Sequence, residues 1–113
     1  MKLVDKKISI GELKQMSVRM FGGLVKAVVD IHKQVMVVDA EMHADEEAYL
    51  LKEGSKQDDL WGINLYPDAT GEDWLEFDSM INLRPSFGNR SRGVDDPDTR
   101  ARIADLVNQL VKR

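Results

Sequence analysis

The strongest constraint on the fold is a pair of alternating apolar segments within residues 24–42. Apolar side chains recur there at every second position, which is typical of two β-strands: Val25, Ala27, Val29 and Ile31, then Met36, Val38, Ala40 and Met42. A turn centred on residues 32–33 sets Val29 opposite Met36. It also sets Lys26 opposite Asp39, a favourable cross-strand pair. A slip of one residue would expose the apolar side chains, so the sequence predicts a hairpin of well-defined register.

Helical patterns flank this hairpin. Ser9 and Glu12 form a capping box at the start of a helix that carries Ile10, Leu13, Met16, Met20 and Phe21, and Gly22-Gly23 is predicted to end it. Residues 43–53 predict a second helix, with three side chains facing inward: Ala44, Ala48 and Leu51. Asp96 and Pro97 mark the start of a third helix, whose buried stripe is Ile103, Leu106, Val107, Leu110 and Val111.

Further strands complete the predicted order. Residues 2–4 suggest an edge strand, and residues 60–67 and 74–85 a second hairpin joined by a loop around Gly71. The order is then β-α-β-β-α-β-β-α. We therefore expect one α+β domain over residues 1–113, with a mostly antiparallel sheet of four or five strands and helices packed on one face.

Composition excludes several classes of protein. Hydrophobic residues make up 42% and charged residues 32% of the chain, which fits neither a disordered nor a membrane protein. The start of the chain does not resemble a signal peptide, and we expect a cytoplasmic protein. The absence of cysteine excludes a thiol nucleophile and a cysteine metal site. A net charge of −4 disfavours binding of nucleic acid over the whole surface, although local contact with a phosphate backbone is compatible with it.

The arginine loop, residues 84–93, is the first candidate site. It has three arginines and no acid, and five of its side chains are candidate ligand-binding groups: Arg84, Ser86, Asn89, Arg90 and Arg92. Arginine offers a fork of donors that fits carboxylate or phosphate, and Gly88 and Gly93 allow close approach of the backbone. An anionic small molecule, a phosphate backbone or an acidic partner segment would suit it. Alternatively, the arginines pair with the acids of residues 39–47, or they form a subunit contact.

His43 is the second candidate, because a histidine near carboxylates can perform acid–base chemistry in a hydrolase. The nearby acids are Asp39, Asp45 and Glu47. No HExxH or paired-histidine motif is present, so we predict no metal site and no cofactor. The simpler alternative is an acid-rich helix start with a histidine near its cap.

The outer face of the predicted second hairpin is the third candidate. Asn64, Tyr66, Trp74 and Asn82 lie there in alternation and would form a surface for a partner or for a homodimer. In the alternative, a loop or the last helix covers these side chains.

Four segments together resemble a family of small bacterial and archaeal proteins known as a domain of unknown function. They are His43-Ala-Asp-Glu-Glu47, Gly54-Ser-Lys-Gln-Asp-Asp-Leu-Trp-Gly-Ile-Asn-Leu-Tyr-Pro67, Glu76-Phe-Asp-Ser-Met-Ile-Asn82 and Arg84-Pro-Ser-Phe-Gly-Asn-Arg-Ser-Arg-Gly93. The resemblance implies a free-standing cytoplasmic protein and carries over no activity, cofactor or catalytic residue. From the residues, we rank a binding module first, an interaction protein second and an enzyme third.

Overall fold

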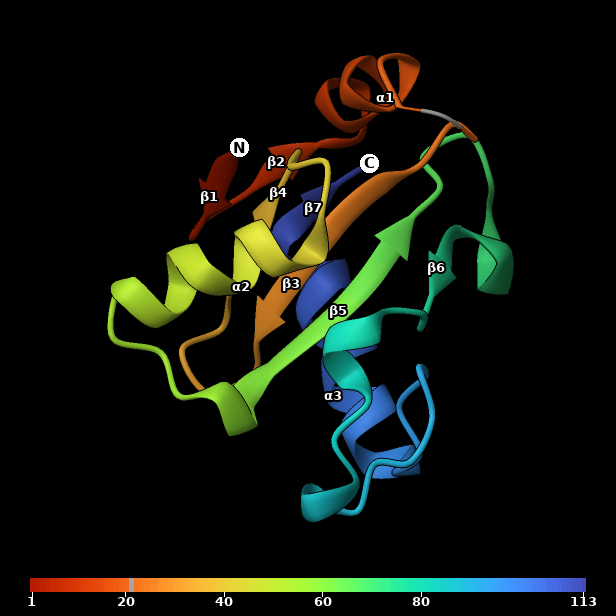
Figure 1. Ribbon diagram of the computed structural model, residues 1–113. Helices are drawn as coiled ribbons and strands as arrows, with labels where there is room; N and C mark the ends of the chain where they lie inside the picture. Colours follow the sequence, from red (N-terminus) through yellow and green to blue (C-terminus); the bar gives the residue numbers. More distant parts are fainter. Residues whose placement is uncertain (21) are drawn as a thin grey trace.

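A computed structural model describes residues 1–20 and 22–113 and has an α+β fold (Figure 1). Its main sheet is antiparallel throughout, in the order β1-β4-β3-β5-β6. The strands of this sheet are β1 (Lys2–Val4), β3 (Val25–Asp30), β4 (Val35–Val38), β5 (Leu60–Leu65) and β6 (Leu75–Glu76). The helices are α1 (Ile10–Val18), α2 (His43–Lys52) and α3 (Pro97–Leu110).

The first hairpin is confirmed in its register. Val29 pairs with Met36, and Ala27 pairs with Val38. The predicted ion pair between Lys26 and Asp39 is wrong. The Asp39 carboxylate instead binds Arg19 at 2.8 Å, because the backbone of Asp39 leaves the strand with a φ of 69°.

The expectation that all helices pack on one face of the sheet is wrong. One face carries Ala27, Val29 and Ile63, and it packs with buried residues of α1 and α3. The opposite face carries Val28 and Val37, and it packs under α2 through Leu50. Figure 1 shows α2 in front of the sheet and α3 behind it. The physical reason is that the second face also carries apolar side chains, among them the paired Val28 and Val37, so both faces need cover.

The inward face of α2 also differs from the prediction. Ala44, Ala48 and Leu51 are exposed, whereas His43, Glu46 and Leu50 are buried against the sheet. The buried set follows helical spacing as well as the predicted one does. Two polar side chains at the start of the helix therefore lie beneath it, where the sequence pattern placed only small apolar residues.

The second predicted hairpin is only half formed. Strand β5 is confirmed, but β6 ends at Glu76, and a 3-10 turn, η3 (Met80–Asn82), replaces the rest of the predicted strand. The side-chain amide of Asn82 accepts from Gly62 N at 2.8 Å and donates to Gly62 O at 2.9 Å. These two bonds satisfy the backbone groups that a neighbouring strand would otherwise have paired.

The ends of the chain add a ladder that the pattern did not predict. Two short strands, β2 (Ile8–Ser9) and β7 (Val111–Lys112), pair in parallel. The predicted N-caps are confirmed, since Ser9 accepts from Glu12 N and Asp96 accepts from Thr99 N. The capping box is only half formed, because the Glu12 carboxylate pairs with Lys2. Helix α1 ends at Val18, before the predicted glycine stop, and Phe21 lies outside the described residues.

Gly62→Ala should destabilise the protein by about 2 kcal/mol, a typical cost of overpacking. A Cβ atom at position 62 would lie 2.5 Å from both Cβ and Oγ of Ser79, so the η3 segment would have to move off the sheet. Urea denaturation should measure the loss. Gly11→Ala is the control, because its Cβ would meet nothing closer than 3.9 Å, and equal stabilities of the two variants would contradict the close packing.

Candidate functional site

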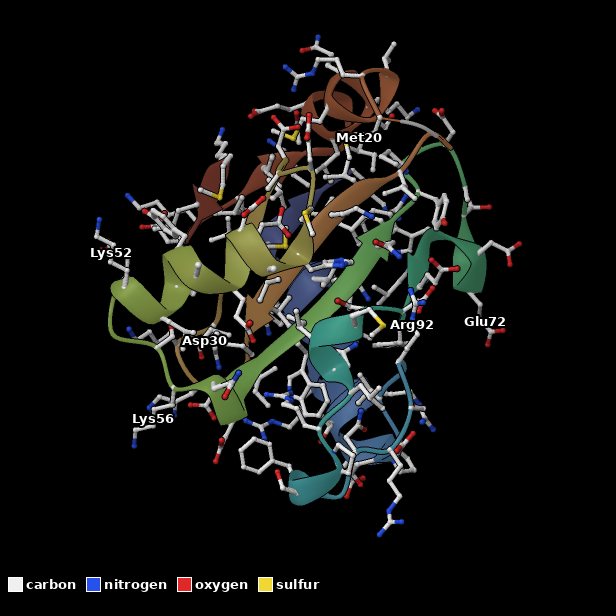
Figure 2. All side chains as sticks on the ribbon, in the orientation of Figure 1. Met20, Asp30, Lys52, Lys56, Glu72 and Arg92 are labelled. Carbon is white, nitrogen blue, oxygen red and sulfur yellow. The ribbon has the colours of Figure 1, made fainter. Side chains whose placement is uncertain are left out.

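A cleft of about 580 Å³ opens beside α2 on the front face of the sheet. Its floor is formed by Lys26 and Asn64, which are cross-strand neighbours on β3 and β5. One wall is the start of α2, residues 42–44, and the opposite wall is residues 78–81. Arg92 lies beside the second wall (Figure 2), and its backbone carbonyl accepts a hydrogen bond from Ser79 N. The cleft exists because β6 stops early and the chain turns across the sheet.

A hydrogen-bonded cluster lies at the end of the cleft nearest β6. Asn64 Nδ2 donates to Glu76 Oε1 at 2.8 Å and to the Asp78 carbonyl at 3.2 Å. The Tyr66 hydroxyl donates to the same Glu76 oxygen at 3.2 Å. Burial, and next the charge of Glu76, raise the pKa of Tyr66, so the phenol stays a neutral donor.

His43 is held in one tautomer. Its Nε2 lies 2.7 Å from the carbonyl oxygen of Ile63, which can only accept, so Nε2 carries the proton. Burial lowers the pKa of His43, and the imidazole is therefore neutral at physiological pH. Nδ1 is then a lone-pair acceptor at the wall of the cleft.

The cleft contains charges of both signs. Lys26 and Arg92 are its cations, and Glu41, Glu76 and Asp78 are its acids. Arg92 Nε donates to Asp78 Oδ1 at 2.8 Å, but both side chains are about half exposed, so this pair is weak and exchangeable. Within residues 1–20 and 22–113, Lys26 forms no ion pair.

Arg84, the first residue of the arginine loop, is committed to the fold. Its guanidinium donates to the carbonyls of Gln57 and Leu60, the latter at 2.8 Å. It also stacks 4.4 Å from the ring centroid of Trp61 and 5.5 Å from that of Phe87. The side chain is buried, so it fastens the loop to β5 and has little left to offer a ligand.

The other four candidate residues of the arginine loop differ in burial and position. Asn89 is buried, donates to the carbonyls of Asn82 and Gly93, and accepts from Asp95 N. Ser86 and Arg90 are exposed away from the cleft, and their binding of a ligand stays a prediction. Arg92 alone of the five candidates lines the cleft. The alternative pairing with the acids of residues 39–47 does not occur for Arg92, whose partner is Asp78.

The predicted interaction face is corrected at two positions. Trp74 is buried among the core residues because it ends a 3-10 turn, η2 (Gly71–Trp74), where strand alternation does not apply. Asn82 is fully buried on Gly62. Asn64 and Tyr66 do lie together, but they line the cleft and do not form a flat outer surface.

Four charged residues of the cleft were not among the predicted site residues: Lys26, Glu41, Glu76 and Asp78. Lys26 was assigned to Asp39, and Glu76 and Asp78 were placed on an extended strand. Their alternation around Phe77 was the available signal, but it does not show that the chain turns back over β5. Asp39, Asp45 and Glu47, the acids expected near His43, lie outside the lining.

Neither a metal-binding cluster nor a membrane-spanning helix is found in the described part of the chain. Among residues 1–20 and 22–113, no cluster of three or more metal-ligating side chains gathers. No helix in this same part of the chain is long and apolar enough to cross a membrane.

Comparison with known protein families matches residues 2–110 to DUF5674, described as a protein of unknown function. The chain belongs to this family. The match spans nearly the whole length, including every cleft residue. No curated protein and no solved structure matches the chain. The DUF5674 assignment therefore confirms the predicted resemblance to a domain of unknown function, and the cleft must be interpreted from its own chemistry.

Glu46 gives this DUF5674 protein a specific pH dependence. Burial raises the pKa of its carboxyl to about 9, from an ordinary value of 4.5. At a pH between these two pKa values, the Glu46 carboxyl must take up a proton when the chain folds. The free energy of unfolding therefore falls as the pH rises from about 5 to 9. Glu46→Gln should remove this loss, and its advantage over the parent should grow by up to about 1.4 kcal/mol per pH unit. Urea denaturation at pH 5 and 8 measures it, with exposed Glu72→Gln as the control; a constant difference would contradict it.

Arg84→Lys should lower the free energy of unfolding by about 2 kcal/mol. Lysine keeps the charge but cannot reach two carbonyls at once while it stacks on Trp61. Arg90→Lys, in the same loop but exposed, should have almost no effect. Chemical denaturation of both variants decides the matter, and similar losses for the two would refute the anchoring role of Arg84.

Proposed function

We propose that this protein is a binding module that holds a small anionic molecule in the cleft, with Lys26 and Arg92 as the counter-charges. The supporting observation is the position of Lys26 on the cleft floor beside Asn64, where within the described chain it has no carboxylate partner. Lys26 is partly buried, and a charge pair inside a cleft is screened less than one in bulk water. Arg92 contributes the remaining donors of its guanidinium.

The carboxylates of the cleft narrow the kind of anion. Glu41, Glu76 and Asp78 would repel an extended acidic peptide or a phosphate backbone laid along the opening. A compact molecule avoids this by placing its charge between the two cations. The proposal therefore moves the site from the arginine loop as a whole to the cleft, and favours a small molecule over nucleic acid. We also propose that the protein acts in the cytoplasm, a compartment in which a fold without disulfides is common.

A catalytic role for His43 is the second candidate function. A neutral imidazole with a fixed tautomer and an open Nδ1 is suited to accept a proton from a bound substrate. The homodimer alternative loses its main anchor, since Trp74 is buried. We therefore place acid–base chemistry above homodimerisation.

Titration with inorganic phosphate, followed by amide NMR, tests the binding proposal. We expect shifts at residues that line the cleft, in particular 26, 43, 64 and 92. Lys26→Gln should weaken binding about tenfold, as expected for the loss of one charge-assisted bond. Lys56→Gln is the matched control, because Lys56 is exposed and lies outside the cleft (Figure 2).

Three outcomes would count against this proposal. Shifts confined to residues 84–91 would return the site to the arginine loop. No shift at millimolar phosphate or acetate would end the anion proposal. Equal weakening by Lys26→Gln and Lys56→Gln would indicate attraction by overall charge only.

A further inference from the structure

We infer that the ligand is a hydroxylated anion, a small molecule with one acidic group and at least two hydroxyl groups, and that Asn64 and His43 accept hydrogen bonds from those hydroxyls. The inference rests on the proposed function, because it names the ligand class of the same cleft. The cleft holds side-chain donors that are already bonded within the protein and side-chain acceptors that have no donor.

Three neutral side-chain donors of the cleft are used within the protein. Both amide hydrogens of Asn64 are directed at acceptors, Glu76 Oε1 and the Asp78 carbonyl. The Tyr66 hydroxyl donates to Glu76, and His43 Nε2 donates to the Ile63 carbonyl. A ligand that offered only acceptors would therefore find its donors at the two cations, at the Ser79 hydroxyl and at the uncapped first backbone N–H groups of α2.

Several side-chain acceptors of the cleft, by contrast, receive no hydrogen bond. Asn64 is 5% exposed, and its Oδ1 is buried without a hydrogen-bond partner among the described residues. The amide cannot be turned round to solve this, because its nitrogen faces two acceptors. A buried polar atom with no partner in the chain calls for a donor from outside it.

His43 adds a second open acceptor. With its proton on Nε2, the ring presents the Nδ1 lone pair, and no hydrogen bond to Nδ1 forms in the described part of the chain. Glu76 and Asp78 line the same space, and the second carboxylate oxygen of each receives no hydrogen bond from residues 1–20 and 22–113. The cleft therefore holds four side-chain acceptors that receive no hydrogen bond from the described residues.

A hydroxylated anion matches this arrangement. Its acidic group pairs with Lys26 and Arg92, and its hydroxyls donate to Asn64 Oδ1 and His43 Nδ1. An ammonium group would also suit the acceptors, but it would lie in the same cleft as two cations. Polyol phosphates and hydroxy acids share the required chemistry.

Three probe molecules test the ligand class. Glycerol 3-phosphate carries two hydroxyls, propyl phosphate carries none, and 3-aminopropyl phosphate carries an ammonium group in their place. Isothermal titration or NMR titration of the whole chain should show glycerol 3-phosphate binding about tenfold or more tightly than propyl phosphate. It should also bind more tightly than the amino compound.

Variants assign the preference to residues. Asn64→Leu should abolish the preference for glycerol 3-phosphate. His43→Gln keeps a donor for the Ile63 carbonyl, and it should reduce the preference for glycerol 3-phosphate over propyl phosphate severalfold. His32→Gln, at an exposed turn, is the matched control and should change neither affinity. Amide spectra check that Asn64→Leu folds, and His43→Gln provides the test if it does not.

The outcomes separate this inference from the proposed function. Equal binding of glycerol 3-phosphate and propyl phosphate overturns the hydroxyl inference and leaves anion binding intact. A preference for the amino compound also overturns it. Failure of all three phosphates to bind refutes the proposed function itself. A preference that survives both Asn64→Leu and His43→Gln overturns the assignment to these residues.

Discussion

The side-chain amide of Asn82 takes the place of a strand beside Gly62, and much of the molecule depends on this pairing. Because the amide satisfies both backbone groups of Gly62, β6 can end after two residues without leaving them unpaired. The chain is then free to cross the front of the sheet, where the missing side chain of Gly62 leaves room for Ser79. The space between that crossing and the start of α2 is the cleft.

Local patterns predicted the parts of the fold that local physics controls. Strand alternation gave the pairing of Val29 with Met36, and capping chemistry gave the starts of α1 and α3. The predicted strand 74–85 was too long because the apolar alternation continues past β6, where the Asn82 side chain and not a strand backbone pairs with Gly62. The one-face arrangement failed because Val28 on β3 and Val37 on β4, which pair on the opposite face of the sheet, are themselves apolar and need a helix over them.

The candidate site was predictable residue by residue but not as an assembly. His43, Asn64, Tyr66 and Arg92 all came from the sequence, yet from three separate hypotheses, and only the fold brings them to one cleft. Charge counting could not separate Arg92 from Arg84, since both belong to one short loop. The difference is made by carbonyls and aromatic rings around Arg84, which no pattern of charges reveals.

The outermost strands of the main sheet have a consequence for behaviour at high concentration. Strand β1 has three residues and β6 has two, so each border offers very little unsatisfied peptide for a strand of another molecule. Exposed Lys2 on β1 and Glu76 on β6 place a charge at each border as well. A strand of another molecule therefore finds few backbone groups to pair with at either edge, and we expect the protein to resist aggregation by strand addition at high concentration.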